Sequence, residues 1–220
     1  MKIALIGATG FVGSAVLAEL LQRGHTVTAL ARSPAKLAAQ AGLGVVAADV
    51  LDAGQVAQAV EGHDAVVSAY NPGWDHPELY AQFTQGSLAI AEGVKQAGVK
   101  RLIVVGGAGS LYVAPGVQLI DTPAFLDHVP ANIVPGAKAA RDELTRLRGE
   151  TTLEWSFLSP PAMLAPGARS GAYRLGGEEL LMDGDKPAGI SAADLAVAIV
   201  DELEQPRHVR QRFTVANRAI

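Results

Sequence analysis

Three glycines near the start of the chain have the spacing of a phosphate-binding turn. Gly7, Gly10 and Gly13 lie in the run GATGFVG, directly after the apolar run 3–6. We expect Gly7 to permit a tight exit from a strand, Gly10 to let backbone approach a pyrophosphate, and Gly13 to let the next helix pack closely. The spacing also fits an ordinary glycine-rich turn, but its place between a first strand and a first helix favours a dinucleotide site. The N–H groups at the positive end of that helix would meet the phosphates. The expected contacts are Gly7, Thr9, Gly10, Phe11, Val12 and Gly13.

The residue after the second expected strand, 26–31, indicates which dinucleotide binds. In dinucleotide folds, an acid about 20 residues after the glycines holds the adenosine ribose and favours NAD. This chain has Arg32 and Ser33 there, with no acid within three residues and with Lys36 nearby. An arginine can bind a 2′-phosphate through two parallel hydrogen bonds, and a solvated surface arginine is the alternative. We therefore expect Arg32 and Ser33 to select NADPH over NADH.

Further candidates follow the fourth and fifth expected strands, because a parallel sheet binds ligands at the carboxyl ends of its strands. Ser68, Ala69 and Tyr70 lie at the end of the fourth strand, and a second glycine turn with Gly107 and Ser110 follows the fifth. We expect Ser68, Ala69, Tyr70 and Gly107 to contact the cofactor. Tyr70 and Ser110 are also candidates for catalysis.

The segment after Tyr70 contains acids and aromatic residues. Asp75 and Glu78, three residues apart, predict a helix start with an N-cap and a capping box, and a catalytic Asp75–His76 pair is the alternative. Trp74 and Tyr112 are candidates for substrate binding, because aromatic side chains can line a flat site, although simple packing is also open. Together these side chains predict a flat wall of Tyr70, Trp74 and Tyr112.

Composition excludes several classes of function. The 220 residues carry a net charge of −4, so the chain has no basic footprint for nucleic acid. The absence of cysteine excludes disulfides and thiol chemistry and agrees with a cytoplasmic location. No apolar run reaches the roughly 18 residues of a membrane span, and no signal-peptide pattern is present. Because the five histidines show no metal-ligand spacing, we expect no metal site.

Strands and helices alternate along the chain, which predicts a single α/β domain over residues 1–220 with a Rossmann-type, doubly wound parallel sheet. We expect the first helix to turn Phe11, Ala15, Ala18 and Leu21 inward. Residues 111–134 lack clean periodicity, and residues of about 160–190 form a small substrate-side extension with a hairpin at Asp183-Gly184. The expected strands are 3–6, 26–31, 44–48, 64–69, 101–105, 152–158 and 212–215, and the expected helices are 11 to about 24, 53–60, 77–96, 135–147 and 191–203. We expect Asp52 to cap the helix 53–60 and Ser191 to cap the helix 191–203.

Several motifs together give the chain a family resemblance. They are GATGFVG, Arg32, Asp49-Val50, FLSPP at 157–161, YRLGG at 173–177 and ISAADLAVAIVDELEQP at 190–206. This combination resembles the atypical short-chain dehydrogenase/reductases, in a branch labelled NAD(P)H-binding or NADH-flavin reductase and akin to NmrA-like proteins and biliverdin reductase B. The resemblance implies that Asp49 and Val50 flank the adenine and that Lys138 meets the ribose. We also expect Ser159 and Pro160 to contact the cofactor, with backbone near Gly107 and Pro160 at the nicotinamide.

The chain departs from this family where the catalytic acid belongs. Typical members use a Tyr-x-x-x-Lys pair, but Val134 stands four residues before Lys138. Lys138 is thus a candidate for ribose binding and catalysis, or an ordinary solvated lysine. Biliverdin reductase B-like proteins can carry a histidine after the Pro-Pro pair, where this chain has Ala162. The neighbouring charges Arg141, Asp142 and Glu143 predict a wet helix surface.

Two classes of function follow from these features. The first is an NADPH-dependent reductase of a flat small molecule such as flavin or quinone, which can accept electrons without a positioned acid. The second is a non-catalytic, NmrA-like dinucleotide sensor that reports redox state to a partner. The missing tyrosine favours the sensor, and the glycine- and aromatic-lined crevice favours the enzyme. Both readings leave the oligomeric state open.

Overall fold

An eight-stranded sheet lies at the centre of the molecule, in the spatial order β10-β14-β8-β5-β4-β1-β2-β3. The computed structural model describes residues 1–218. All neighbouring strands of this sheet are parallel except β10, which is antiparallel to β14. The predicted Rossmann-type fold is confirmed. The strands are β1 (Lys2–Ile6), β2 (Thr26–Ala31), β3 (Leu43–Ala47), β4 (Ala65–Ser68), β5 (Arg101–Val105), β8 (Glu154–Ser159), β10 (Tyr173–Gly176) and β14 (Gln211–Asn217).

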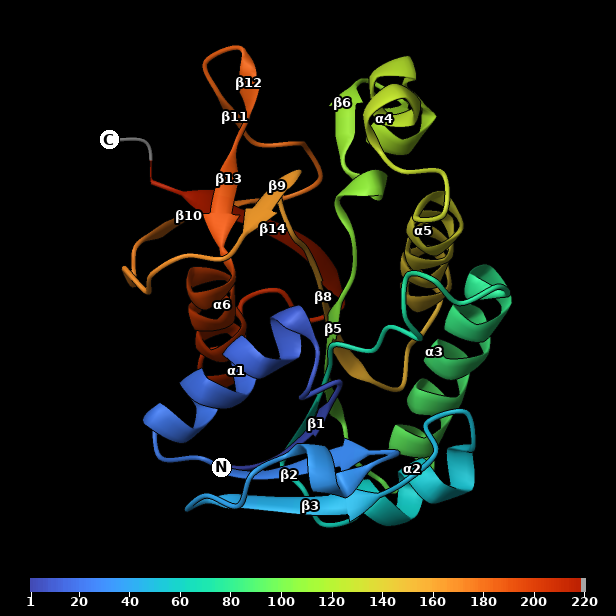
Figure 1. Cartoon of the computed structure of the whole chain (residues 1–220), viewed down its shortest axis with the longest axis vertical. Helices are drawn as coiled ribbons and strands as arrows, with labels where there is room; N and C mark the ends of the chain where they lie inside the picture. The colour runs from blue at the N-terminus through green and yellow to red at the C-terminus, as the bar shows by residue number, and fades with distance from the viewer. Residues whose placement is uncertain (219–220) are drawn as a thin grey trace.

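Helices cover both faces of the sheet (Figure 1). Successive residues of a strand point to opposite faces. In β1, therefore, Ile3 and Leu5 join the core under α1 and α6, while Ala4 and Ile6 join the core under the other helices. Among the residues that the structure describes, none of the helices has the length and apolar character needed to cross a membrane. The main helices are α1 (Phe11–Gln22), α2 (Ala53–Val60), α3 (Leu79–Gln96), α5 (Val134–Arg148) and α6 (Ala192–Glu204).

The order of the strands reverses between β1 and β4. The chain passes from β1 to β2 and β3 on one side, and then returns to place β4 and β5 on the other. The two turns that leave β1 and β4 therefore lie side by side, and the N–H of Ala69 donates to the carbonyl of Ile6 at 3.0 Å. Open α/β sheets bind their ligands at such a switch point.

The buried face of α1 differs from the prediction. Phe11 is 51% exposed, and Ala18 is exposed as well. The buried apolar positions are Val16, Leu17 and Leu20. The helix is turned this way because it packs on α6 as well as on the sheet, so that its buried strip includes residues that face another helix.

Helix ends confirm some predictions and correct others. Asp52 caps α2 by accepting from Gly54 N at 2.8 Å, and Ser191 caps α6 by accepting from Asp194 N at 3.0 Å. The predicted cap at Asp75 is wrong, because α3 begins at Leu79 and its first turn has no side-chain cap. The segment 73–79 instead forms successive turns, in which Leu79 N donates to the carbonyl of residue 76.

The wet surface predicted for residues 141–143 of α5 is also partly wrong. Arg141 and Asp142 are partly exposed, but only 8% of Glu143 is exposed. Burial raises the pKa of Glu143 to about 8, and Arg146 offsets part of that effect. This carboxyl is therefore a buried titratable group rather than a surface charge.

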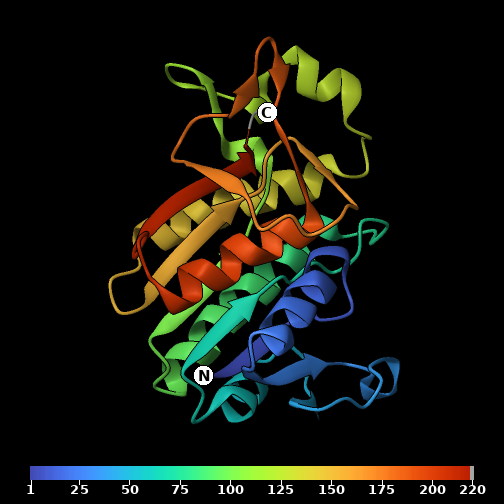
Figure 2. The same ribbon diagram turned by 90° about the vertical axis from the view of Figure 1, so that its left-hand side faces the viewer.

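The extension is more ordered than predicted. Its strand β9 (Met163–Ala165) pairs with β13 (Gly189–Ser191), and β10 joins the edge of the main sheet. The predicted hairpin is confirmed as β11 (Met182–Asp183) and β12 (Lys186–Pro187). Residues 111–134 form short elements that gather at the same end of the molecule as this hairpin (Figure 2). They are β6 (Tyr112–Ala114), β7 (Val117–Gln118) and α4 (Pro123–His128).

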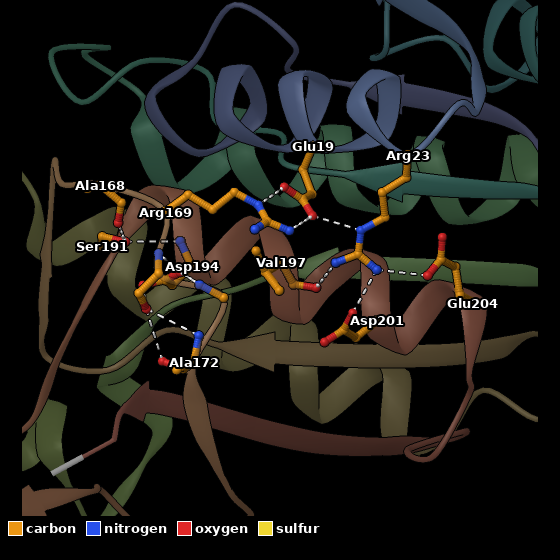
Figure 3. Close-up of polar contacts among 12 residues, drawn as sticks. Glu19, Arg23, Ala168, Arg169, Ala172, Ser191, Asp194, Val197, Asp201 and Glu204 are labelled. Carbon is orange, nitrogen blue, oxygen red and sulfur yellow. Dashed lines mark hydrogen bonds and ion pairs between the residues drawn. The ribbon is translucent and has the colours of Figure 1, made fainter. Parts of the chain in front are cut away.

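Polar contacts fasten the loop 166–172 of the extension to α1 and α6 (Figure 3). Arg169 donates to both carboxylate oxygens of Glu19, at 2.7 and 2.9 Å. Asp194 accepts from the backbone N–H groups of Ser170 and Gly171, at 2.8 Å each. Because α1 also begins at the glycine turn, these contacts fix the extension to the helix expected to bind the dinucleotide.

Candidate functional site

A cavity of about 200 Å³ lies at the switch point, between the turn after β1, the ends of β2 and β3, and the loop after β4. We call it the dinucleotide cavity, after the ligand expected there. It joins segments that lie far apart in the sequence, as predicted for a dinucleotide site. Its walls alternate between backbone, apolar and cationic groups, which suits an adenosine with its phosphates. The predicted cofactor contacts that line it are Gly7, Thr9, Arg32, Ser33, Val50 and Tyr70.

The glycine turn has the geometry expected for phosphate binding. Gly7 has a φ of +83°, and a Cβ there would lie 2.3 Å from the carbonyl oxygen of Ala69. A Cβ on Gly13 would lie 2.0 Å from the carbonyl oxygen of Gly7, so only glycine permits this close approach of helix and turn. At Gly10, the N-cap of α1, a Cβ would meet a single atom within 4 Å, the carbonyl oxygen of Gly7 at 3.3 Å, which is a tight contact but a less severe one than at Gly7 or Gly13. Gly7 and Gly13 thus shape the turn, and Gly10 leaves room for a ligand.

The start of α1 is open to an anion. The helix has neither a side-chain cap nor an acidic residue in its first turn. Its first N–H groups therefore keep their donor capacity for a pyrophosphate. Val12 is half-buried there, and the exposed ring of Phe11 lies beside the same turn.

Two cationic side chains line this cavity. Arg32 follows β2, and the short helix Pro34–Lys36 brings Lys36 to the same cavity. Within residues 1–218, Arg32 forms neither a hydrogen bond nor an ion pair, so its guanidinium is available to a ligand. Asp49 does not line the cavity, and its Oδ1 accepts from Leu51 N at 3.0 Å. The residues present therefore fit a dinucleotide, and their charge fits one that carries a 2′-phosphate.

Tyr70 forms a wall of this cavity, and its geometry argues against a role as proton donor. Its hydroxyl donates to the carbonyl of Gln82 at 3.1 Å. Burial raises its pKa to about 12, with a smaller opposing effect from Arg32. The ring fits only because residue 86 of α3 is glycine, where a Cβ would lie 2.3 Å from the ring. The catalytic candidate Tyr70 is better described as a packing and lining residue.

Ser110 is also placed unfavourably for catalysis. Only 2% of Ser110 is exposed, Ser159 is fully buried, and Nη1 of Arg212 lies 3.4 Å from both hydroxyls. Arg212 also donates to the carbonyl of Glu178 at 2.9 Å and forms an ion pair with its carboxylate. The buried arginine thus joins β14 to the ends of β5 and β8 and to the extension. The sequence showed Arg212 only as the start of a final strand, so this role was missed.

Val134 occupies the position of the family's tyrosine, so the side chain at that place in the structure is aliphatic. Val134 is the first residue of α5, and Lys138 lies about one turn later, exposed and without a hydrogen bond to any described residue. A Cβ on Gly107 would lie 3.8 Å from Cβ of Ala140, so the second glycine turn packs on the same helix. Ser68 and Pro160 are buried at the ends of β4 and β8. Lys138 thus has no partner among the described residues, and Val134 supplies no acid.

The three aromatic candidates do not form one wall. Tyr70 lines the dinucleotide cavity, whereas Trp74 lines a cavity of about 570 Å³ with residues 75–81, Asn132 and Pro135. Tyr112 lines a third cavity, of about 710 Å³, with residues 113–116, 178–180 and 182. The predicted common wall of Tyr70, Trp74 and Tyr112 is therefore wrong, and Trp74 alone keeps a large exposed face, 47%.

The fold and the glycine turn define a Rossmann-type dinucleotide-binding protein. Residues 7–206 match the family described as NAD(P)H-binding, and the chain belongs to this family. It is 38% identical to Bacillus subtilis YwnB over the full length of both chains. A Bacteroides thetaiotaomicron structure provisionally named an epimerase is 44% identical, with a TM-score of 0.90, over 100% of this chain and 98% of that one. A Streptococcus pneumoniae structure provisionally named an NADH-flavin reductase is 33% identical, with a TM-score of 0.83, over 99% and 100%.

Proposed function

We propose that this protein is an NADPH-dependent reductase of a flat, conjugated acceptor such as a flavin or a quinone. The preference for NADPH is supported by Arg32 and Lys36, which line the adenosine end of the cavity, where an acid would favour NAD. A cytoplasmic location belongs to the proposal and is supported by the absence of cysteine. The observation that carries the choice of acceptor is the aliphatic residue Val134 at the position of the family's acid.

The side chains around the site would bind and orient the cofactor and the acceptor, and would not donate or accept protons. The start of α1 would hold the pyrophosphate, Arg32 the 2′-phosphate and Lys138 the ribose hydroxyls. When bound, NADPH supplies a hydride, and a quinone or flavin takes up that hydride together with one proton from water. Reduction of a simple ketone normally uses a positioned acid, which is worth about 10²–10⁴-fold in rate. A conjugated ring depends more on its orientation than on such an acid.

Trp74 is the proposed acceptor wall. Asn71 lines the dinucleotide cavity, and Trp74 comes three residues later, which limits the separation of their Cα atoms to about 11 Å. The indole rests on the first turn of α5, since a Cβ on Gly136 would lie 2.9 Å from its Cζ3. The same helix carries Lys138, the proposed ribose contact, two residues after Gly136.

The proposal is tested by NADPH oxidation with a panel of flavins, quinones, ketones and aldehydes. We expect slow turnover with flavins or quinones and little with simple ketones. Trp74→Ala should lower acceptor turnover at least tenfold and leave the Kd of NADPH nearly unchanged, while Tyr112→Ala, in the separate cavity, should change neither. Efficient ketone reduction with an acid limb in its pH profile would contradict the proposal.

The second candidate function is a non-catalytic, NmrA-like sensor. It is favoured by the same absence of a tyrosine at Val134. Tight NADPH binding without turnover of any acceptor, together with a change in a partner's binding between the two redox forms of the dinucleotide, would support this function instead.

A further inference from the structure

The Trp74 cavity differs from the dinucleotide cavity in its charge. Its volume of about 570 Å³ lies within the range of small-molecule sites. The indole of Trp74 and the phenol of Tyr80 both line it and are 47% and 42% exposed. Exposed aromatic faces of this kind stack well on a flat conjugated ring. The cavity is thus shaped for such a ring rather than for a small carbonyl compound.

The charged side chains of this cavity are acidic. Asp75 and Glu78 line it, whereas none of its lining residues is a lysine or an arginine. Within residues 1–218, neither carboxylate forms an ion pair, and the amide of Asn132, which donates to Oδ1 of Asp75 at 3.4 Å, carries no charge to offset it. Nδ1 of His76 accepts from the backbone N–H of Glu78 at 3.1 Å, so this histidine nitrogen is used within the loop. Two uncompensated carboxylates therefore lie beside the aromatic faces.

This arrangement discriminates between acceptors by charge. A carboxylate repels an anionic substituent on a ring that stacks on Trp74, and it attracts a cationic one. The electron-rich faces of Trp74 and Tyr80 act in the same direction, because aromatic faces also favour cations. Both effects leave a neutral ring largely unaffected.

We propose that the acceptor bound in the Trp74 cavity is a flat conjugated ring without negative charge, and this inference rests on the proposed reductase function. Asp75 and Glu78 exclude its phosphorylated, sulfonated and carboxylated relatives. A neutral quinone or a flavin without its phosphate is the substrate class that this chemistry selects. In the reaction, the ring gains two electrons and two protons. The hydride of NADPH supplies both electrons and one of the protons, solvent supplies the other proton, and NADPH becomes NADP⁺.

The test compares riboflavin with FMN, which share one ring system and differ by a phosphate. At low salt and saturating NADPH, we expect kcat/KM to be about tenfold higher for riboflavin, because two carboxylates act on the phosphate through solvent. The preference should shrink in high salt, which screens exposed charges. A neutral naphthoquinone and its sulfonate form a second matched pair, in case the flavin ring is too large.

The variant Asp75→Asn/Glu78→Gln removes both charges and keeps the size of the side chains. We expect it to raise kcat/KM for FMN about tenfold and to leave that for riboflavin within twofold. The matched control, Glu61→Gln/Asp185→Asn, removes two exposed acids that do not line the cavity and should leave the preference unchanged. Equal kcat/KM for the two acceptors of both pairs in the wild type, or the same response in the variant and the control, would overturn the inference.

A binding measurement separates this inference from the proposed function. Flavin fluorescence is quenched when the ring stacks on an indole, so titration in the presence of NADP⁺ reports binding without turnover. We expect riboflavin to bind about tenfold more tightly than FMN, with the quenching lost in Trp74→Ala. Charge-selective binding without turnover would overturn the reductase function and support the charge selection. If the two flavins bind equally, or if neither binds, the charge selection is overturned even when turnover is seen.

Discussion

Arg32 is the side chain that we propose to select NADPH over NADH. It lines the cavity beside Ser33 and Lys36 without a hydrogen bond or ion pair to the rest of the described chain. A charge-assisted hydrogen bond contributes on the order of 1.5–3 kcal/mol, or about ten- to a hundredfold in affinity. We therefore expect Arg32→Ala to weaken NADPH binding by that factor and NADH binding hardly at all, as measured by nucleotide fluorescence. Equal losses for both nucleotides would mean that the arginine does not meet a 2′-phosphate.

The three glycines of the turn differ in what a substitution should do. A Cβ added at Gly10 would lie 3.3 Å from the carbonyl oxygen of Gly7, a tight contact that a small backbone shift relieves, whereas at Gly13 it would lie 2.0 Å from the same oxygen. We expect Gly10→Val to keep native circular dichroism and to lose dinucleotide binding, because its side chain occupies the space of the pyrophosphate. Gly13→Ala should instead lower the Tm. Retained binding in a folded Gly10→Val variant would place the phosphates elsewhere.

At the scale of elements, α3 shapes the dinucleotide cavity without touching it. Gly86 supports the ring of Tyr70, and a Cβ at position 86 would lie 2.3 Å from that ring. Overpacking of this kind costs about 1–3 kcal/mol unless a neighbour moves, and here the neighbour can move toward the cavity. We expect Gly86→Ala to weaken NADPH binding about tenfold although residue 86 does not line the cavity.

A double variant checks the direction of that movement. Tyr70→Ala removes the ring, so adding Gly86→Ala to it should cause no further loss of NADPH affinity. A double-mutant cycle of the dissociation constants measures this coupling. Additive losses would show that α3 acts on the cavity by another route.

Elements with a repeated local pattern were predicted well from the sequence. The strands β1, β2 and β5 lie within one residue of the predicted ranges, because strands of a parallel sheet that helices cover form mostly apolar runs. Asp52 and Ser191 were found because an N-cap acts on residues two or three positions away.

Features that depend on distant partners could not be predicted. Glu19 lies on the buried face of α1 because Arg169, 150 residues away, pairs with its carboxylate. The position of Phe11 and the separation of Trp74 from Tyr112 depend likewise on segments that meet only in the folded chain. The sequence could therefore predict the strand ends that form the site, but not which side chains share a cavity.

The buried carboxyl of Glu143 makes the stability of the whole molecule depend on pH. Its pKa in the folded chain is about 8, against an ordinary value of 4.5, because burial disfavours the charged form. Between these two pH values the folded state holds a proton that the unfolded state has lost, so the free energy of unfolding falls as pH rises through this window. Glu143→Gln is neutral at every pH. We expect its stability to match the wild type at pH 5 and to exceed it at pH 9 by on the order of 2–4 kcal/mol. Urea unfolding at several pH values measures this difference, with the exposed Glu61→Gln as a control that should follow the wild type. A difference that is independent of pH would mean that Glu143 is charged in the folded protein throughout.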